Sequence, residues 1–136
     1  MTGAKCVLVI DDEDSVRSMI ETALTGAGYQ VFSRANGTEG LETLETQTVD
    51  LVLTDILMPE KEGVETIVEI RQRFPNVRII AMSGGGRTQN MQPLKIAGDL
   101  GADVLLAKPF DLDNLLAIVE SVILQGPRRC GPADAS

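Results

Sequence analysis

The chain has 136 residues and 43% apolar content, which suits one globular domain with a single hydrophobic core. Its net charge of −8 argues against nucleic-acid phosphate as a direct partner. The chain contains no histidine, which excludes Ser-His-Asp and Cys-His triads, His-ligated zinc and a phosphohistidine on this chain. Any chemistry must therefore use carboxylates, hydroxyls, amines and backbone groups.

The two cysteines, Cys6 and Cys130, form neither a metal-binding nor a redox pair by their spacing. So few cysteines fit a reducing compartment and no disulfide framework. The apolar run from Val7 to Ile10 is too short for a secretory signal, and no segment approaches membrane-spanning length. We therefore expect a cytoplasmic protein.

The first part of the chain predicts strands and helices in alternation. Strands are predicted at 5–10, 29–33 and 50–54. Between the first two, apolar residues at helical spacing run from Val16 to Ala27, and this predicted helix stops at Gly28. A shorter helix is predicted near 38–46, between an Asn-Gly pair and the third strand.

The second part continues the same alternation. Strands are predicted at 77–82 and 103–107. A helix over roughly 63–73 should end before Pro75, because the residue preceding a proline disfavours helical backbone. The last helix starts near Asp111, a predicted N-cap, and carries an apolar stripe from Leu115 to Ile123.

Two segments lack apolar periodicity. After Ser83 the chain reads "GGGRTQNMQP", which predicts a loop extending well past the fourth strand before any helix begins. The segment 126–136, "GPRRCGPADAS", is rich in glycine and proline and is interpreted as a disordered tail. The alternating elements before it predict an α/β, doubly wound fold with a parallel sheet and right-handed crossovers.

Polar residues follow four of the five predicted strands. Asp11 and Asp12 follow the first strand, Asp55 the third, Ser83 the fourth and Lys108 the fifth. In open α/β sheets, ligands bind outside the carboxyl ends of the strands, where the strand order reverses. These groups are therefore expected to line one crevice, and they are suited to phosphoryl chemistry.

If the first and third strands are neighbours, Asp11, Asp12 and Asp55 crowd together. Like charges at such distances raise one another's pKa or demand a cation between them. Hard oxygen ligands favour Mg²⁺ or Mn²⁺ over zinc. The metal would hold a phosphoryl group against Asp55, which as a nucleophile gives an aspartyl phosphate. Lys108 would add a positive charge and Ser83 a hydroxyl donor.

Four sequence pieces carry a family resemblance: "VLVIDDED", "DLVLTDILMPEKEG", "IIAMSG" and "LLAKPF". In this order and spacing, across residues 5–125, they resemble the receiver domain of bacterial two-component response regulators. The resemblance implies a flavodoxin-like, five-stranded parallel sheet with strand order 2-1-3-4-5 and helices on both faces. We assign the receiver domain to residues 1–125.

The resemblance also implies a reaction and its partners. Asp55 would accept phosphate from a histidine kinase or a histidine phosphotransfer protein. The Mg²⁺ ligands would be the carboxylates of Asp11, Asp12 and Asp55 and the backbone carbonyl of Leu57. The chain would catalyse only its own phosphorylation and dephosphorylation, so it is not expected to be an enzyme acting on a released substrate.

The resemblance further implies how the signal leaves the domain. Lys108 would contact the phosphate, while Ser83 would turn inward and remodel the face formed by helix 4, strand 5 and helix 5. In this numbering, helix 4 is the helix that receivers carry after the 84–93 loop, strand 5 is the strand at 103–107 and helix 5 is the last helix. Receivers often carry Tyr or Phe three residues before the lysine, where this chain has Leu105. We hypothesise that movement of 84–93 replaces part of that aromatic's role. The output would reach a downstream protein partner or return through phosphotransfer, and a phosphorylation-dependent dimer is compatible with it.

Two alternatives stay open at this point. A haloacid-dehalogenase-like phosphatase would use Asp12 and Asp14 as an Asp-x-Asp pair, with Ser83 and Lys95 in later roles, but it leaves Asp55 without a purpose. The other is a receiver-like docking module that is never phosphorylated. The presence of every polar site residue argues against that module.

Four further acids are interpreted as structural. Glu13 or Asp14 is expected to cap the first helix and to favour its positive end. Asp99 and Asp103 are interpreted as surface or helix-end acids.

Overall fold

The computed structural model describes residues 5–55, 63–83, 101–107 and 110–126. Within these ranges, five strands form one parallel sheet in the order β2-β1-β3-β4-β5, which confirms the predicted fold class and strand order. The strands are β1 (Cys6–Ile10), β2 (Gln30–Arg34), β3 (Leu51–Asp55), β4 (Arg78–Ser83) and β5 (Val104–Ala107).

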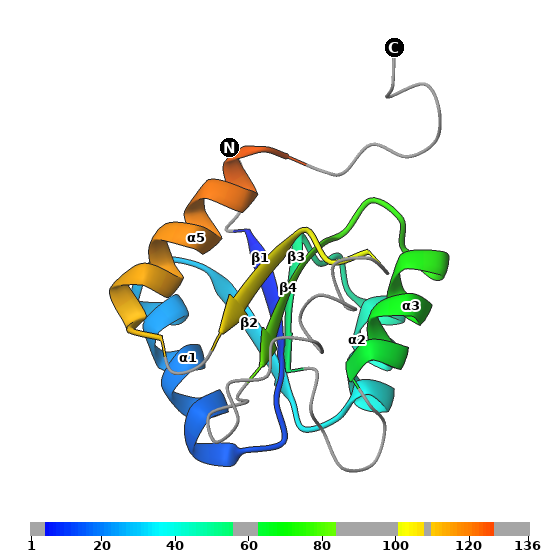
Figure 1. The fold of residues 1–136 in the computed structure, drawn as a ribbon, viewed down its shortest axis with the longest axis horizontal. Coiled ribbons are helices and arrows are strands. Elements are labelled where there is room, and N and C mark those ends of the chain that lie inside the picture. Colours follow the sequence, from blue (N-terminus) through cyan, green and yellow to red (C-terminus); the bar gives the residue numbers. More distant parts are fainter. Residues whose placement is uncertain (1–4, 56–62, 84–100, 108–109, 127–136) are drawn as a thin grey trace.

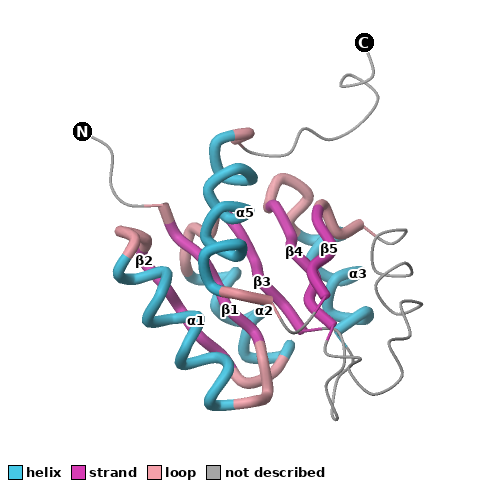
Figure 2. Tube along the Cα trace, turned by 60° about the vertical axis from the view of Figure 1, so that its left-hand side comes forward, coloured by secondary structure: helices cyan, strands magenta, loops and turns pink. Residues whose placement is uncertain are grey.

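Helices cover both faces of the sheet. The described helices are α1 (Asp14–Gly26), α2 (Gly37–Thr46), α3 (Gly63–Arg73) and α5 (Leu112–Leu124). Helices α1 and α5 lie on one face, and α2 and α3 lie on the other (Figure 1). Seen from the turned view of Figure 2, α1 and α5 lie in front of the strands. The expected loop at 84–93 and the tail after Gly126 lie outside the described residues.

The core consists of two layers that share the strands. In β1, Val7 and Val9 pack with α1 and α5, whereas Leu8 and Ile10 pack with α2 and α3. All of β1 and β3 is buried, which explains why these segments are apolar at nearly every position. Burying each such side chain contributes about 1.5–3 kcal/mol before the entropy of folding is subtracted.

Gly40 lets α2 approach the carboxyl end of β1 closely. A Cβ atom at Gly40 would overlap the Cδ1 atom of Ile10 and would lie 2.9 Å from its Cγ1 atom. Ile10 is fully buried and directly precedes Asp11. The missing side chain of Gly40 therefore sets the packing beneath the first acid of the candidate site.

Each predicted strand begins one residue too early. The residues before the strands still take part in ladder-like bonds, as where the Asp50 amide donates to the Cys6 carbonyl at 2.9 Å. At the other end, Asp55 and Ser83 are the last residues of β3 and β4 rather than the first residues after them. Asp55 is in register with Met82, so its backbone is held by the neighbouring strand.

Asp103 lies just before β5 and is not a surface acid, so its interpretation from the sequence is wrong. Its side chain is 12% exposed. The Ile79 amide donates to its Oδ2 atom at 2.8 Å, and the guanidinium groups of Arg71 and Arg78 also bind this carboxylate. Asp103 therefore caps the amino end of the sheet. Asp99 lies outside the described residues.

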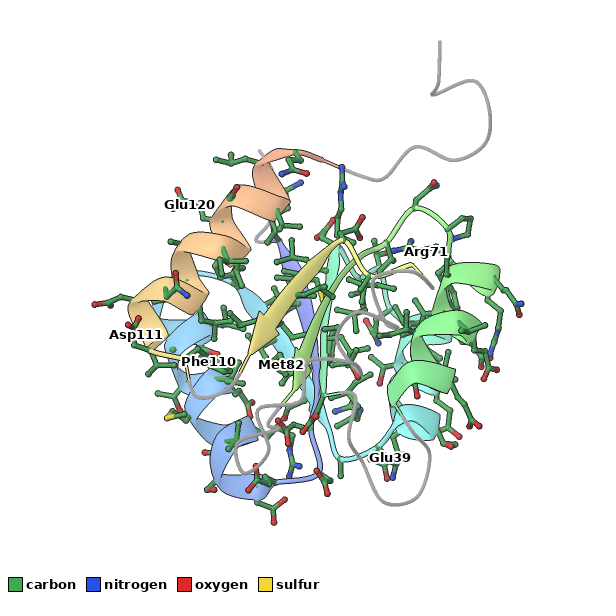
Figure 3. All side chains as sticks on the ribbon, in the orientation of Figure 1. Glu39, Arg71, Met82, Phe110, Asp111 and Glu120 are labelled. Atoms are coloured by element: carbon green, nitrogen blue, oxygen red, sulfur yellow. The ribbon has the colours of Figure 1, made fainter. Side chains whose placement is uncertain are left out.

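Arg71 extends this network to the end of α3 (Figure 3). Its guanidinium donates to the carbonyls of Gly101 at 2.8 Å, Val77 at 2.7 Å and Pro75 at 3.0 Å. One side chain thus ties the last turn of α3 to the segments that enter β4 and β5. Among the described residues, no helix combines the length and the apolar character needed to cross a membrane.

Candidate functional site

Three carboxylates meet at the carboxyl edge of the sheet. Asp11 follows β1, Asp12 comes next in the chain, and Asp55 ends β3. One oxygen from each of the three lies within 4.8 Å of the others. The strands β1 and β3 are direct neighbours with Ile10 opposite Thr54, which is why residues so far apart in sequence converge. The proximity predicted from the sequence is therefore confirmed.

The three acids differ in burial. Asp11 is 0% exposed and Asp55 is 4% exposed, whereas Asp12 is exposed. Buried carboxylates are costly unless hydrogen bonds or a cation compensate the loss of hydration. Two of these acids are thus fixed by the fold, and the third faces solvent at the rim.

Asp11 is held by both of its neighbouring elements. Its amide donates to the carbonyl of Arg34 at 3.1 Å, which ties it to the end of β2. Its Oδ1 atom accepts a hydrogen bond from the Glu13 amide at 2.9 Å. The direction of the Asp11 carboxylate is therefore set by the turn that leads into α1.

That turn corrects the expected cap of the first helix. Glu13 is the N-cap residue of α1, but its side chain makes no capping hydrogen bond. Asp14 stands in the first turn, where its charge favours the positive end of the helix. The Glu13 amide instead donates to the side chain of Asp11, two residues upstream, at the entrance to the helix. At the other end of the chain, Asp111 caps α5 as predicted, accepting from the Asn114 amide at 2.7 Å.

Arg17 is a residue of this site that the sequence interpretation missed. Its Nη1 atom donates to the Asp11 carbonyl at 2.6 Å, and its Nη2 atom binds the Asp14 carboxylate. The only sequence signal was the spacing of three residues between Asp14 and Arg17, which is common on exposed helix faces. Nothing in that spacing pointed to the Asp11 carbonyl.

The donor set fits a hard divalent cation. Around Mg²⁺, ligand oxygens at about 2.0–2.1 Å from the ion lie roughly 3–4 Å from one another, so three oxygens within 4.8 Å need little movement to share one ion. Two like charges 4.8 Å apart repel by about 1 kcal/mol even in bulk water, and by more where water is excluded. A cation would turn this repulsion into attraction.

The other predicted site residues are placed only in part. Ser83 ends β4 and is in register with Ala107, so its backbone lies at the same edge of the sheet as Asp55. Leu57, Lys95 and Lys108 lie outside the described residues. Leu105, at the position where receivers often carry an aromatic residue, lies on β5 and is 43% exposed.

The family described as "Response regulator receiver domain" matches residues 7–120 of the chain. The chain belongs to the response regulator receiver domain family. This confirms the resemblance seen in the sequence, and it argues against the phosphatase alternative. In that alternative Asp12 and Asp14 would act together, but Asp14 has an 88% exposed side chain and pairs with Arg17.

The relatives of this chain differ in how much of their own length the chain matches. The chain is 38% identical over 117 residues to the DNA-binding transcriptional regulator NtrC of Escherichia coli strain K12, covering 86% of this chain and 24% of that protein. It is 32% identical to sporulation initiation phosphotransferase F of Bacillus subtilis strain 168, covering 86% of this chain and 92% of that protein. The chain thus spans less than a third of NtrC and most of the phosphotransferase.

Solved structures show the same fold. The CheY-like receiver domain protein of Methanospirillum hungatei JF-1 superposes with a TM-score of 0.82 at 27% identity, covering 90% of this chain and 97% of that one. The chemotaxis response regulator CheY4 of Vibrio cholerae gives a TM-score of 0.76 at 29% identity, covering 88% and 98%. The sheet and its helices are therefore those of a receiver domain.

Proposed function

We propose that Asp55 accepts a phosphoryl group, with Mg²⁺ held by Asp11, Asp12 and Asp55, and that this reaction controls a protein partner. The main support is the convergence of the three carboxylates, with oxygens within 4.8 Å, at the carboxyl edge of the sheet. That edge is where open parallel sheets bind ligands. Membership of the receiver family supports the same role.

Asp55 is the best placed of the three acids to act as the nucleophile. It ends β3, which lies between β1 and β4, so groups from both neighbouring strands can surround its carboxylate. The Thr54 hydroxyl donates to the Asp55 carbonyl at 3.2 Å and helps to fix its backbone. Asp12 is exposed at the rim of the site, whereas Asp55 is 4% exposed and ends the central strand of the sheet. These positions favour metal binding by Asp12 and its chain neighbour Asp11, and attack by Asp55.

In the proposed reaction, a carboxylate oxygen of Asp55 attacks the phosphorus atom of a phosphohistidine on another molecule. The new O–P bond forms while the N–P bond breaks, and the leaving imidazole keeps the electron pair and takes a proton from solvent. Bound Mg²⁺ supplies positive charge that offsets the charges of the phosphoryl group and the carboxylates. The carbonyl of Leu57, the amine of Lys108 and the hydroxyl of Ser83 keep the roles that the resemblance gives them, as predictions.

The donor must be another molecule, because this chain contains no histidine. A histidine kinase or a histidine phosphotransfer protein has the required chemistry. We place the output at the face formed by β5, α5 and the helix that receivers carry between β4 and β5. Leu105 of β5 is 43% exposed and would contribute to this face. A protein that binds this face, or a second copy of the chain, would read the phosphorylated state in the cytoplasm. Direct DNA contact by this chain is not part of the proposal.

Intact-mass spectrometry tests the proposal. The chain is incubated with acetyl phosphate and Mg²⁺, beside a sample with chelator and an Asp55→Asn variant. We expect one phosphoryl adduct that requires Mg²⁺ and is absent from the variant. No adduct in the wild-type chain, together with no binding of beryllofluoride, would instead support a docking module that is not phosphorylated. Turnover of a generic phosphomonoester would revive the phosphatase alternative.

A further inference from the structure

Arg17 joins the two ends of the acidic turn that leads from β1 into α1. Its side chain is 19% exposed, whereas that of its partner Asp14 is 88% exposed. One nitrogen of its guanidinium binds the Asp11 carbonyl at 2.6 Å, and the other binds the Asp14 carboxylate. A mostly buried guanidinium on a backbone carbonyl is a fixed part of the fold rather than a solvated surface charge.

We propose that Arg17 is a positioning residue for Mg²⁺, which holds the turn from Asp11 to Asp14 in the shape that keeps Asp12 beside Asp11 and Asp55. This inference rests on the proposed function, because it assumes that the three carboxylates bind the metal. It adds to the proposed metal site a residue that does not touch the ion.

Hydrogen bonds fix the backbone of the turn before and after Asp12. The Asp11 amide binds the Arg34 carbonyl at 3.1 Å, and the Glu13 amide binds Asp11 Oδ1 at 2.9 Å. The Arg17 amide then binds the Glu13 carbonyl at 2.9 Å, which starts the helix. Asp12 is exposed, so packing does not direct its side chain and the backbone of the turn must do so. The Arg17 side chain is the link that spans this turn from its first residue to its last.

Charge and position predict opposite effects for the loss of Arg17. A guanidinium near the site repels a divalent cation, so if its charge alone mattered, removing it would tighten Mg²⁺ binding. If it holds Asp12 in place, removing it weakens binding, because part of the binding energy must then order the turn. The sign of the change therefore separates the two roles.

The geometry also explains why the residue is an arginine. A guanidinium presents several N–H groups in a rigid fork and can bind the Asp11 carbonyl and the Asp14 carboxylate at once. A lysine ammonium is a compact charge on a flexible stem and does not reproduce this bridge. Arg17→Lys thus keeps the charge and removes the bridge.

The test is calorimetric titration of Mg²⁺ into the metal-free protein, without any phosphoryl donor. We expect the Kd for Mg²⁺ to rise about tenfold in Arg17→Ala, as for other residues that orient metal ligands without touching the ion. Arg17→Lys should show a rise in the same direction. Arg73→Ala, which removes an exposed arginine at the end of α3, is the matched control and should leave the Kd unchanged.

Unfolding of the metal-free variants separates positioning from a purely structural role. A structural role alone would lower the free energy of unfolding of Arg17→Ala and leave its Kd unmoved, which would overturn the inference. An unchanged or lower Kd in Arg17→Ala overturns it as well. If Arg17→Ala does not fold, Arg17→Lys decides in the same way. Absence of Mg²⁺ binding by the wild-type chain would overturn the proposed function together with the inference, so the two failures are distinguishable.

Discussion

Aspartates at the two edges of the same sheet have opposite surroundings. At the amino edge, the Asp50 carboxylate accepts from the Cys6 amide at 2.8 Å, and the Asp103 carboxylate accepts from the Ile79 amide at 2.8 Å. Asp103 also binds two arginines. At the carboxyl edge, the carboxylates of Asp11, Asp12 and Asp55 lie against one another.

The direction of parallel strands accounts for much of this difference. At the amino edge the strands begin, so they present backbone N–H groups that carboxylates can accept from. At the carboxyl edge they end, and the carbonyl groups presented there repel carboxylates. Acids at the amino edge can therefore complete the sheet, whereas acids gathered at the carboxyl edge are best suited to a cation. The same residue type stabilises the fold at one edge and, in the proposed function, binds the metal and accepts the phosphoryl group at the other.

The largest expected effect tests the amino edge. Asp103→Ala should lower the free energy of unfolding by about 3 kcal/mol, because it leaves the Ile79 amide and two partly buried guanidinium groups without this acceptor. Denaturant unfolding of the metal-free protein measures the loss. Glu42→Ala, at an exposed position of α2, should change it by less than about 0.5 kcal/mol. A similar small loss for both variants would mean that Asp103 is not structural.

The next prediction tests the carboxyl edge, where removing an acid should raise the free energy of unfolding of the metal-free protein rather than lower it. Without metal, Asp12→Ala should raise the free energy of unfolding by about 1 kcal/mol, because one like charge leaves the cluster. With Mg²⁺ at 100 times its Kd, the wild-type chain should gain about 2.7 kcal/mol, and the variant should gain much less. Thermal unfolding with and without Mg²⁺ checks both statements. Destabilisation of the metal-free variant would contradict the contrast between the two edges.

The packing beneath the acids gives a further test. Gly40→Ala should cost about 1–3 kcal/mol, because its Cβ atom would displace the buried Ile10 side chain. Since Ile10 precedes Asp11, we also expect weaker Mg²⁺ binding. Gly26→Ala is the matched control, because nothing lies within 4 Å of the added atom and the stability should be equal or slightly higher. Equal unfolding midpoints for the two variants would show that the site tolerates movement of α2.

The smallest expected effect concerns Cys6 at the amino edge. Burial raises the pKa of the Cys6 thiol above its ordinary value of 9.0, and the negative charge of Asp50 raises it further. The folded chain therefore holds this proton more tightly than the unfolded chain, and the resulting stability is lost as pH rises through the folded pKa. Between about pH 8 and pH 10, the free energy of unfolding should fall more for the wild type than for Cys6→Ala. Parallel pH profiles would contradict this.

The sequence predicts the sheet and the meeting of its acids well, because both depend on local patterns. Apolar runs of strand length fix β1 and β3, and neighbouring strands that end in Asp11 and Asp55 must bring these residues to one edge. Strand order came from the family resemblance. The contacts of Asp103 could not be predicted in this way, because its partner Arg71 is 32 positions away and they meet only through packing.

The turn before α1 shows a different limit of prediction from sequence. Four consecutive acids from Asp11 to Asp14 look alike in sequence, and the expected cap was placed on Glu13 or Asp14. In the structure Asp11 supplies the acceptor for the Glu13 amide, and Arg17 closes the turn. The backbone path between β1 and α1 decides which of the four acids accepts the hydrogen bond at the start of the helix. Composition carries no information about that path.

The position of the phosphoryl group on Asp55 can be tested directly. After phosphorylation with acetyl phosphate and Mg²⁺, reduction with borohydride converts an aspartyl phosphate into homoserine, and peptide mass spectrometry then locates the converted residue. We expect homoserine at position 55 and unconverted aspartate at positions 11 and 12. Conversion at position 11 or 12 with Asp55 left intact would contradict it.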